Sequence, residues 1–372
     1  MKYQYILSTI TSVILLCFIS IKIMFPFWAK QPVFHVYDLH YYFMSPKVIQ
    51  ENKTKHNKWI NYNNIVPVYS LKENESYTTE MVELISQHYL RNKSLEYMPK
   101  KQHILPYINT KDVIIMHYYY ADKMIGTITL RTLDMILSSK KITIQYVDYL
   151  CIAQEHRKKG IAQELIATLY DAQQRDTSYK VSLFKNEGKQ RGIIPLTIYH
   201  SYRCNIKTVK VNPLYMPYKI TVITDKQLHT LYEMFREIQR TFICYISMSV
   251  AQLVSLILTK NITLYTLQYK DTVLALYFIK NTQCFHNNKE VKELYCSFKS
   301  NGCTKEMFIA GCRQIIGNIQ KTDHEIIIEK IGHNAWLLES FKSNITSSYV
   351  TGYYLYNYIH KTVSPHDVYI NV

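Results

Sequence analysis

The sequence contains little glycine and proline, and no segment is dominated by a few residue types. Only 9 glycines and 10 prolines occur among 372 residues. No flexible Gly/Pro-rich linker therefore divides the chain. A chain of this length can hold one large domain or two of ordinary size. We expect continuous folded structure rather than domains that are joined by a loose tether.

The pattern of cysteines argues against a disulfide framework and against a metal site. Eight cysteines are scattered along the chain, and no pair has the Cys-x-x-Cys spacing. That spacing is typical of zinc and redox sites. We therefore expect free thiols in a reducing compartment and no bound metal.

Acidic residues are scarce relative to basic ones. The chain has 28 Asp and Glu against 44 Lys and Arg, which gives a net charge of +16. Such a surplus favours an anionic partner: nucleic acid, an acidic membrane face or a polyphosphate cofactor. There is no zinc-finger spacing, no aromatic RNA-binding motif and no basic tail, so we do not expect nucleic acid binding.

The N-terminal segment is apolar. Residues Tyr3 to Ile21 carry no charge and form a run that is long enough to span a bilayer. No small-x-small cleavage site follows, which argues against a cleaved signal peptide. We expect residues 1–26 to be a retained single-pass membrane anchor. Because most nearby lysines follow the segment, the rest of the chain should face the cytoplasm. A helix that packs on the protein's own surface is the alternative.

The periodicity of apolar residues predicts two similar units. The first extends from about Tyr69 to Ile220, with helices expected over Thr78–Tyr89 and Gly160–Arg175. The strands expected in this unit are Val113–Tyr120, Ile125–Arg131, Ile142–Ile152, Val181–Phe184 and Val209–Val211. A short turn at Ala121-Asp122-Lys123 should join the first two of these strands.

The second unit repeats this order less clearly. Its predicted helices are Lys226–Arg240, Ser249–Leu258, Lys305–Asn318 and Ala335–Phe341. Its predicted strands are Asn261–Tyr269, Val273–Ile279, Lys292–Phe298, Glu325–Lys330 and Gly352–Tyr358. We predict an α/β (α+β) protein built from a duplicated unit with a mostly antiparallel, saddle-shaped sheet. Without a linker, the first half (27–220) and the second half (221–372) should share that sheet.

A strand, a basic loop and a helix start follow one another between Val147 and Ala162. The loop contains Arg157-Lys158-Lys159, and the helix begins at Gly160. A helix start offers unpaired N–H groups and the positive end of the helix dipole. Small residues let a phosphate approach the backbone. The pattern predicts a pyrophosphate cradle, with a solvated basic turn as the alternative.

Three segments, in this order along the chain, carry a family resemblance. They read Phe-Trp-Ala-Lys-Gln-Pro-Val at Phe27–Val33, Tyr-Val-Asp-Tyr-Leu-Cys-Ile-Ala at Tyr146–Ala153, and Gly-Tyr-Tyr-Leu-Tyr-Asn-Tyr at Gly352–Tyr358. They resemble Phe-Trp-x-x-Gln-Pro-Val, Glu-Ile-Asn-Phe-Leu-Cys-Val-His and Tyr-Tyr-Leu-Tyr-Asn-Trp of the glycylpeptide N-tetradecanoyltransferases, or N-myristoyltransferases. The Arg-x-x-Gly-x-Ala loop after the second segment also resembles the acyl-CoA-binding motif of the wider GNAT acyltransferase superfamily.

The resemblance implies an acyltransferase and its ligands. It implies duplicated GNAT units, myristoyl-CoA as the acyl donor, the N-terminal glycine amine of proteins or peptides as the acceptor, and a monomer. It assigns the oxyanion hole for the thioester to the backbone N–H groups of Tyr149 and Leu150. It assigns the catalytic base to the α-carboxylate of Val372.

Two further groups of residues follow from the resemblance. The implied acyl-CoA site consists of Phe27, Trp28, Tyr149, Leu150, Cys151, Ile152, Arg157, Lys158, Lys159, Gly160, Ile161 and Ala162. The implied acceptor site consists of Tyr89, Leu90, Tyr97, Asp148, Tyr199, His200, Tyr354 and Asn357.

The sequence also departs from the family pattern. Tyr146 stands where the family has Glu, and Asp148 stands where it has an Asn that is thought to help order the reacting groups. Residues 346–348 are Thr-Ser-Ser where the family has Gly-Asp-Gly. An ionised Asp148 near the amine could assist deprotonation, whereas a buried, unpaired Asp148 would cost stability.

Three functions are compatible with these observations. The first is membrane-anchored N-myristoyl transfer. The second is another CoA-dependent N-acyl transfer, such as acetylation, because the Arg-x-x-Gly-x-Ala loop fits it equally well. The third is a catalytically degenerate binding protein of the same fold, for which the departures at Tyr146, Asp148 and 346–348 would be expected.

Overall fold

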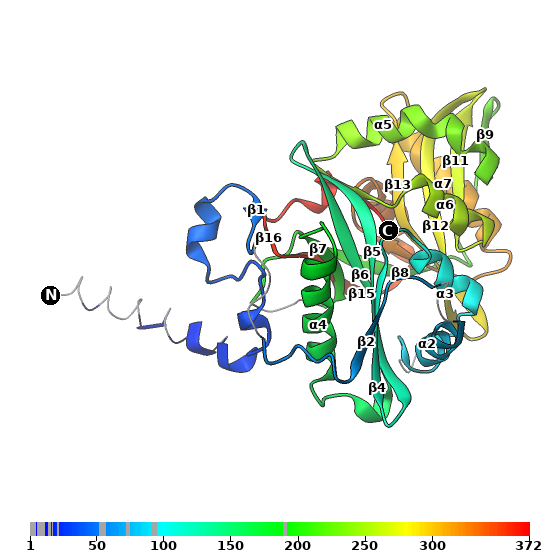
Figure 1. Ribbon diagram of the computed structural model, residues 1–372. Coiled ribbons are helices and arrows are strands. Elements are labelled where there is room, and N and C mark those ends of the chain that lie inside the picture. Colours follow the sequence, from blue (N-terminus) through cyan, green and yellow to red (C-terminus); the bar gives the residue numbers. More distant parts are fainter. Residues whose placement is uncertain are drawn as a thin grey trace.

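One large sheet organises the chain (Figure 1). A computed structural model describes residues 5, 12–13, 16, 18–20, 22–51, 57–71, 75–90, 95–188 and 192–372. Within these residues the sheet has 15 strands, and its main path runs β17-β10-β5-β6-β7-β15-β8-β14-β13-β12-β11-β9. Strand β4 pairs with β5 and with β2, and β3 pairs with β12. Both predicted units thus contribute to one continuous sheet, as expected from the absence of a linker.

The strands of the sheet are mostly antiparallel, as predicted; the parallel pairs are β6–β7, β13–β14 and β10–β17. The strand bounds are β2 Ile65–Val68, β3 Glu96–Tyr97, β4 Ile114–Tyr120, β5 Lys123–Leu137, β6 Lys140–Ile152, β7 Ser182–Glu187, β8 Thr197–Asn205, β9 Tyr218–Ile223, β10 Cys244–Ser247, β11 Ile262–Tyr269, β12 Thr272–His286, β13 Lys289–Lys299, β14 Glu325–Glu329, β15 Ile345–Tyr356 and β17 Val368–Asn371. A separate two-stranded sheet joins β1 (Lys47–Val48) to β16 (Tyr358–Ile359).

Seven α-helices pack against the sheet in the described residues. They are α2 Glu75–His88, α3 Lys101–Ile108, α4 Ile161–Asp176, α5 Tyr232–Thr241, α6 Val250–Leu258, α7 Lys305–Ile319 and α8 Asn334–Glu339. Helix α4 lies close to β5 because Gly126 has no side chain there. A Cβ at Gly126 would lie 3.2 Å from both Leu165 Cδ1 and Tyr118 Cβ, which is closer than ordinary van der Waals contact.

The same sequence of elements occurs twice. In the first unit the antiparallel pair β5–β6 leads through α4 to β7, which lies parallel to β6. In the second, the antiparallel pair β12–β13 leads through α7 to β14, which lies parallel to β13. Each parallel pair is short: β6 and β7 share three register positions, and β13 and β14 share four. Beyond these positions the pairing ends in each unit, at Val147 and Phe184 in the first and at Leu294 and Ile328 in the second.

Several predicted elements need correction. Val209–Val211 is not a strand; Val211 instead packs against α7 at Gly317, where an added Cβ would lie 2.7 Å from Val211 Cγ2. The predicted helix Lys226–Arg240 begins as a 3-10 helix over Asp225–Leu231 before α5. Helix α3 was not predicted, since it contains Pro106, which normally interrupts a helix. Strands β8, β9 and β10 were also missed.

No helix among the described residues is long and apolar enough to cross a membrane. The predicted anchor, Tyr3–Ile21, lies largely outside the described residues.

Burial of His117 should make the protein sensitive to acid. This residue of β4 is 2% exposed, its Nδ1 lies 3.3 Å from Thr127 Oγ1, and burial lowers its pKa to about 4. The ordinary pKa of about 6.5 applies in the unfolded chain. The unfolded state therefore binds more protons below pH 6.5, and the free energy of unfolding must fall as the pH drops from about 6.5 to about 4.

Between pH 7 and pH 4 the free energy of unfolding should fall by about 3 kcal/mol less in His117→Gln than in the wild type. Denaturant unfolding of both proteins between pH 7 and pH 4 measures it. Some acid sensitivity should remain in the variant, because burial also lowers the pKa of His333 to about 3. Identical pH profiles for the two proteins would contradict the prediction.

Candidate functional site

A cavity of about 710 Å³ lies where β6 parts from β7. Its walls come from both units, including β5, β6 and β7 of the first and β12, β13 and β14 of the second. Side chains on the two sides of the sheet differ, because alternate residues of a strand face opposite ways. The register pairs Tyr146 with Leu183 and Val147 with Phe184. Consecutive residues of each strand line the cavity, namely Tyr146 and Val147 of β6 and Phe184 and Lys185 of β7. The cavity therefore reaches both faces of the sheet.

The arm of the cavity beneath α4 is apolar. It is lined by Trp28, Ile166, Leu169, Tyr170, Phe184 and Tyr356. Trp28 stacks on Phe184 with ring centroids 5.7 Å apart, and Tyr170 meets Tyr356 edge to face at 4.8 Å. Gln173 and Ser182 also line the cavity, and Ser182 Oγ donates a hydrogen bond of 2.8 Å to Gln173 Oε1. An alkyl chain in this arm would gain about 0.8 kcal/mol per buried CH₂.

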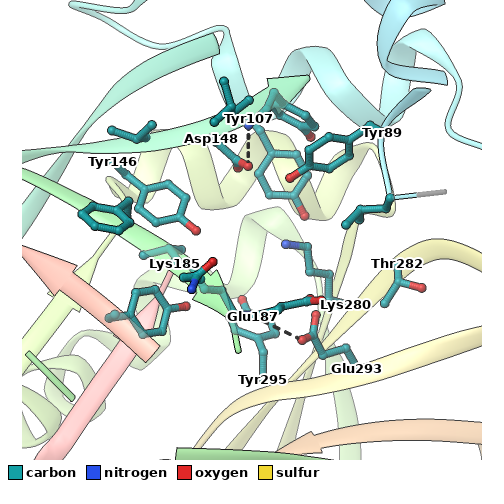
Figure 2. A pocket seen from close by; sticks show the side chains of 18 of the residues that line it. Tyr89, Tyr107, Tyr146, Asp148, Lys185, Glu187, Lys280, Thr282, Glu293 and Tyr295 are labelled. Atoms are coloured by element: carbon teal, nitrogen blue, oxygen red, sulfur yellow. Dashed lines mark hydrogen bonds and ion pairs between the residues drawn. The ribbon is translucent and has the colours of Figure 1, made fainter. Parts of the chain in front are cut away.

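The arm on the opposite face is polar and charged (Figure 2). Lys185 Nζ lies 2.5 Å from Glu329 Oε1 and 3.8 Å from Glu293 Oε1. Lys280 Nζ lies 4.8 Å from the centroid of the Tyr107 ring. Burial opposes protonation of Lys280, but Tyr107, Glu293 and Asp148 outweigh it and raise its pKa. Both lysines are therefore cationic at neutral pH.

Arg131 is a buried cation at the wall of this arm. It is 1% exposed, and its Nη1 donates a 3.3 Å hydrogen bond to Gln252 Oε1. Its guanidinium carbon lies 5.0 Å from the Tyr146 ring centroid and 5.7 Å from that of Tyr107. Cation–π contacts of this kind stabilise a buried guanidinium.

Tyrosines surround the point where the two arms meet. Six of them line the cavity here: Tyr89, Tyr97, Tyr107, Tyr146, Tyr149 and Tyr295. Burial raises the pKa of each, and the charge of Asp148 adds to the rise for five of them, all but Tyr295. These phenols are therefore neutral, and they can donate hydrogen bonds to an anion or a carbonyl.

Strand β6 changes course at this junction. Thr127 pairs with Cys151 and Thr129 with Asp148, so Tyr149 and Leu150 form a bulge opposite Ile128. Tyr149 has φ of +48°, an uncommon value for a residue other than glycine. Its N–H donates a 2.8 Å hydrogen bond to Oδ1 of Asp148 (Figure 2). Both residues of the bulge line the cavity, so this irregular part of the backbone lies at its wall.

A second pocket, of about 530 Å³, lies at the N-terminus of α4. Gly160 precedes the helix with φ of +88°, and no side chain caps its first turn in the described structure. Arg157, Lys158 and the first residues of α4 line the pocket. Uncapped N–H groups, the helix dipole and two cations together suit a phosphate group. These residues therefore fit the phosphates of a CoA-type ligand.

Arg157 also braces the loop before α4. Its Nε donates a 3.0 Å hydrogen bond to the carbonyl of Ile152, and its Nη2 donates one of 2.5 Å to the carbonyl of His88. The guanidinium therefore ties the end of β6 to the end of α2. It shapes the pocket in addition to contributing charge.

Many of the residues predicted from the sequence come together at these two pockets. The main cavity is lined by Trp28, Tyr89, Leu90, Tyr97, Asp148, Tyr149, Leu150 and Val372. The pocket at α4 is lined by Tyr89, Leu90, Leu150, Cys151, Ile152, Arg157, Lys158, Gly160, Ile161 and Ala162. Residues that are distant in sequence, such as Tyr89 and Val372, thus share one site.

Other predicted residues lie outside the two pockets. Phe27 packs against Trp28 and Trp59, and Lys159 is exposed. His200 is exposed on β8, while Tyr199 is buried against Tyr353. Tyr354 is buried against Phe184, and Asn357 bonds the backbone of Gln50 and Lys180. Contact with a ligand in either pocket is therefore not expected for these six in this conformation.

Sequence reasoning missed several lining residues, including Arg131, Lys185, Lys280, Glu293 and Tyr295. Strand alternation offered a signal for some of them. Tyr353 lines the main cavity, whereas its neighbour Tyr354, which the resemblance implied for the acceptor site, does not. The residues from β12 and β13 could not be found in this way, since their approach to β6 depends on the packing of the two units.

The last residue of the sequence reaches the centre of the molecule (Figure 1). Strand β17 pairs with β10, and Tyr295 donates a 2.8 Å hydrogen bond to Asn371 Oδ1. Val372 is 7% exposed and lines the main cavity. Val372 therefore lies at the wall of the site. Within the described part of the chain, no group of three or more His, Cys, Asp or Glu residues is placed to hold a metal ion.

Comparison with known proteins gives three kinds of similarity. Residues 78–191 match the acetyltransferase (GNAT) family. A protein of Acanthamoeba polyphaga mimivirus, provisionally named a glycylpeptide N-tetradecanoyltransferase, is 28% identical over 113 residues, which are 27% of this chain and 29% of the viral protein. The match thus spans less than a third of that relative's length.

Solved structures extend the similarity to nearly the whole chain. One structure of Saccharomyces cerevisiae N-myristoyltransferase with bound myristoyl-CoA is 12% identical, with 93% of this chain and 91% of the yeast chain covered at a TM-score of 0.72. Another gives 13% identity, 91% and 94% coverage and a TM-score of 0.71. The chain contains a GNAT-family region and has the N-myristoyltransferase fold, which confirms the resemblance predicted from the three motifs.

Proposed function

We propose that this chain, with its N-myristoyltransferase fold, transfers a myristoyl group from myristoyl-CoA to the N-terminal glycine amine of proteins or peptides. One observation carries the proposal: a single cavity joins an apolar arm, a main-chain bulge and a polar arm, and a phosphate-compatible helix start lies beside it. The apolar arm suits the alkyl chain of an acyl-CoA, the bulge its thioester, and the helix start its phosphates. The polar arm suits the amine acceptor.

The donor would lie across the gap between β6 and β7. Its phosphates would bind at Arg157, Lys158 and the start of α4, and its alkyl chain would enter the arm beneath α4. Trp28 and Phe184 would then contact the chain, and the Gln173–Ser182 pair supports a limit on its length, because burying these polar groups against more methylenes is unfavourable.

The reaction itself requires a free amine and a stabilised oxyanion. A terminal ammonium has a pKa near 7.7–8.0, so deprotonation at pH 7 costs only about 1.4 kcal/mol. The α-carboxylate of Val372, at the cavity wall, would accept that proton. The amine would then attack the thioester carbonyl, whose oxygen would be stabilised by the N–H groups of Tyr149 and Leu150. The carbon–sulfur bond would break, and the departing CoA thiolate would take up the proton that the nitrogen loses as the amide forms.

The purified chain should acylate a peptide that begins with Gly when it is supplied with myristoyl-CoA. Mass spectrometry would detect the added myristoyl group, and a peptide that begins with Ala should react poorly. Competition between myristoyl-CoA and acetyl-CoA separates this function from acetylation. Preferential acetyl transfer, or binding of acyl-CoA without transfer to any amine, would contradict the proposal.

Deletion of Val372 should lower kcat by a factor of about 10²–10⁴, which is the range for loss of a general base. Binding of myristoyl-CoA, measured by calorimetry, should change little, because Val372 belongs neither to the pocket at α4 nor to the apolar arm that would hold the alkyl chain. Val372→Ala is the matched control, as it keeps the terminal carboxylate in place and should retain most of the activity. Equal activity of the deletion variant and the wild type would exclude this base.

The N-terminal segment is proposed to anchor the enzyme to a membrane, on the basis of the uncharged run Tyr3–Ile21. A bilayer beside the site would help to retain the product, since a single myristoyl chain binds membranes only marginally. The full chain should sediment with membranes after high-salt washing, whereas a chain that lacks residues 1–26 should not. Release of the full chain by salt would indicate a peripheral attachment instead.

A further inference from the structure

The carboxylate of Asp148 occupies a main-chain donor that the proposed reaction needs. Asp148 Oδ1 accepts the N–H of Tyr149 at 2.8 Å (Figure 2). A single N–H cannot serve both this carboxylate and a thioester oxygen that becomes negative in the transition state. The two anions would also repel each other in a cavity of low polarity. Asp148 must therefore leave Tyr149 before that N–H can act on a substrate.

The cavity offers the displaced carboxylate one suitable partner. Lys280 lines the same cavity and points into it beneath Tyr107 (Figure 2). Its protonation is favoured in part by the charge of Asp148, so the two groups already interact across the space. Among the described residues, no carboxylate forms an ion pair with Lys280, whereas Lys185 and Arg203 in the same cavity have Glu329 and Glu325.

The other neighbours of Asp148 do not offer the same exchange. Burial raises the pKa of Tyr89, Tyr97 and Tyr107, so these phenols are neutral and do not offer a positive charge to the carboxylate. The Nε of Arg131 has no partner among the residues that the structure describes, but this guanidinium is held between the rings of Tyr107 and Tyr146 and donates from Nη1 to Gln252. Thr129 Oγ1 donates a 3.1 Å hydrogen bond to the carbonyl of Asp148, which holds the main chain at this residue and leaves its side chain to rotate.

We infer that Asp148 is a displaceable cap on the Tyr149 N–H, and that Lys280 receives its carboxylate when the thioester carbonyl of the donor enters. This inference rests on the proposed acyl-CoA function. Asp148 is then a positioning residue whose exchange between two partners couples donor binding to the opening of the oxyanion hole. Lys280 sets how readily the cap is released.

Two non-reactive donor analogues provide the test with the full chain. One is a CoA ketone, in which a methylene separates the sulfur from the carbonyl, and the other is an alkyl-CoA thioether without a carbonyl. Calorimetry gives the Kd of each. Asp148→Ala should tighten binding of the ketone about tenfold, because a charge-assisted hydrogen bond no longer competes with it. The thioether should bind the variant and the wild type equally.

Lys280→Met should weaken ketone binding about threefold, and it should have no effect in the Asp148→Ala background. Lys292→Met is the matched control, because Lys292 lies on the adjacent strand, pairs with Glu290 and Asp323, and is not among the residues that line the cavity. Thermal unfolding of each variant verifies that the fold is retained.

The outcomes separate the inference from the function on which it rests. If neither analogue binds the wild type, the proposed acyl-CoA function fails. If both analogues bind but Asp148→Ala changes their Kd values by the same factor, or changes neither Kd, then Asp148 does not act as a cap on the Tyr149 N–H. If the effect of Lys280→Met persists in the Asp148→Ala background, Lys280 does not receive the carboxylate.

Discussion

Strands β6 and β7 stop pairing after Val147 and Phe184, and the candidate site follows from that interruption. In an intact sheet the main-chain groups of adjacent strands satisfy one another. Where two strands part, these groups need other partners, and a gap opens through which a ligand can reach both faces. Here the bulge at Tyr149 and Leu150 turns the backbone into that gap. The apolar and polar arms meet there because the two faces of the sheet are covered by different elements.

The second unit contains a second interruption of the same kind. Strands β13 and β14 pair through Leu294 and Ile328 and then separate. The next residues, Tyr295 and Glu329, line the same cavity as the first gap. One continuous sheet therefore holds two openings that face a common space. Strand β17 pairs with β10. The residue that follows it, Val372, lines this space together with residues of both units.

One carboxylate in the cavity has a different kind of partner from the other charged groups. Lys185 is held by Glu329 and Glu293, and Arg131 is enclosed by aromatic rings. Asp148 differs, because its partner is a backbone N–H rather than a cation. A buried carboxylate without any partner is strongly unfavourable in free energy. Exchange of a backbone N–H for a nearby ammonium group keeps the carboxylate paired. The substitution of Asp for the family's Asn thus gives this chain an electrostatic feature that the family pattern does not have.

The sequence determined the elements whose signal is local. Apolar periodicity predicted α2, α4, α7 and most of β6, together with the first half of β5, Ile125–Arg131. The basic loop before Gly160 predicted a pocket at the start of α4. Local signals failed where packing overrides propensity. Helix α3 tolerates Pro106, and Val209–Val211 packs against Gly317 instead of joining the sheet.

Only the tertiary structure decided which side chains share the site. Lys280 and Asp148 are separated by more than a hundred residues and line one cavity because β12 and β6 are brought together by packing. The same packing turned Tyr353 rather than Tyr354 towards the polar arm, and left His200 exposed on β8. Strand pairing and side-chain direction depend on long-range contacts between the units, and these contacts have no signature within a short segment of sequence.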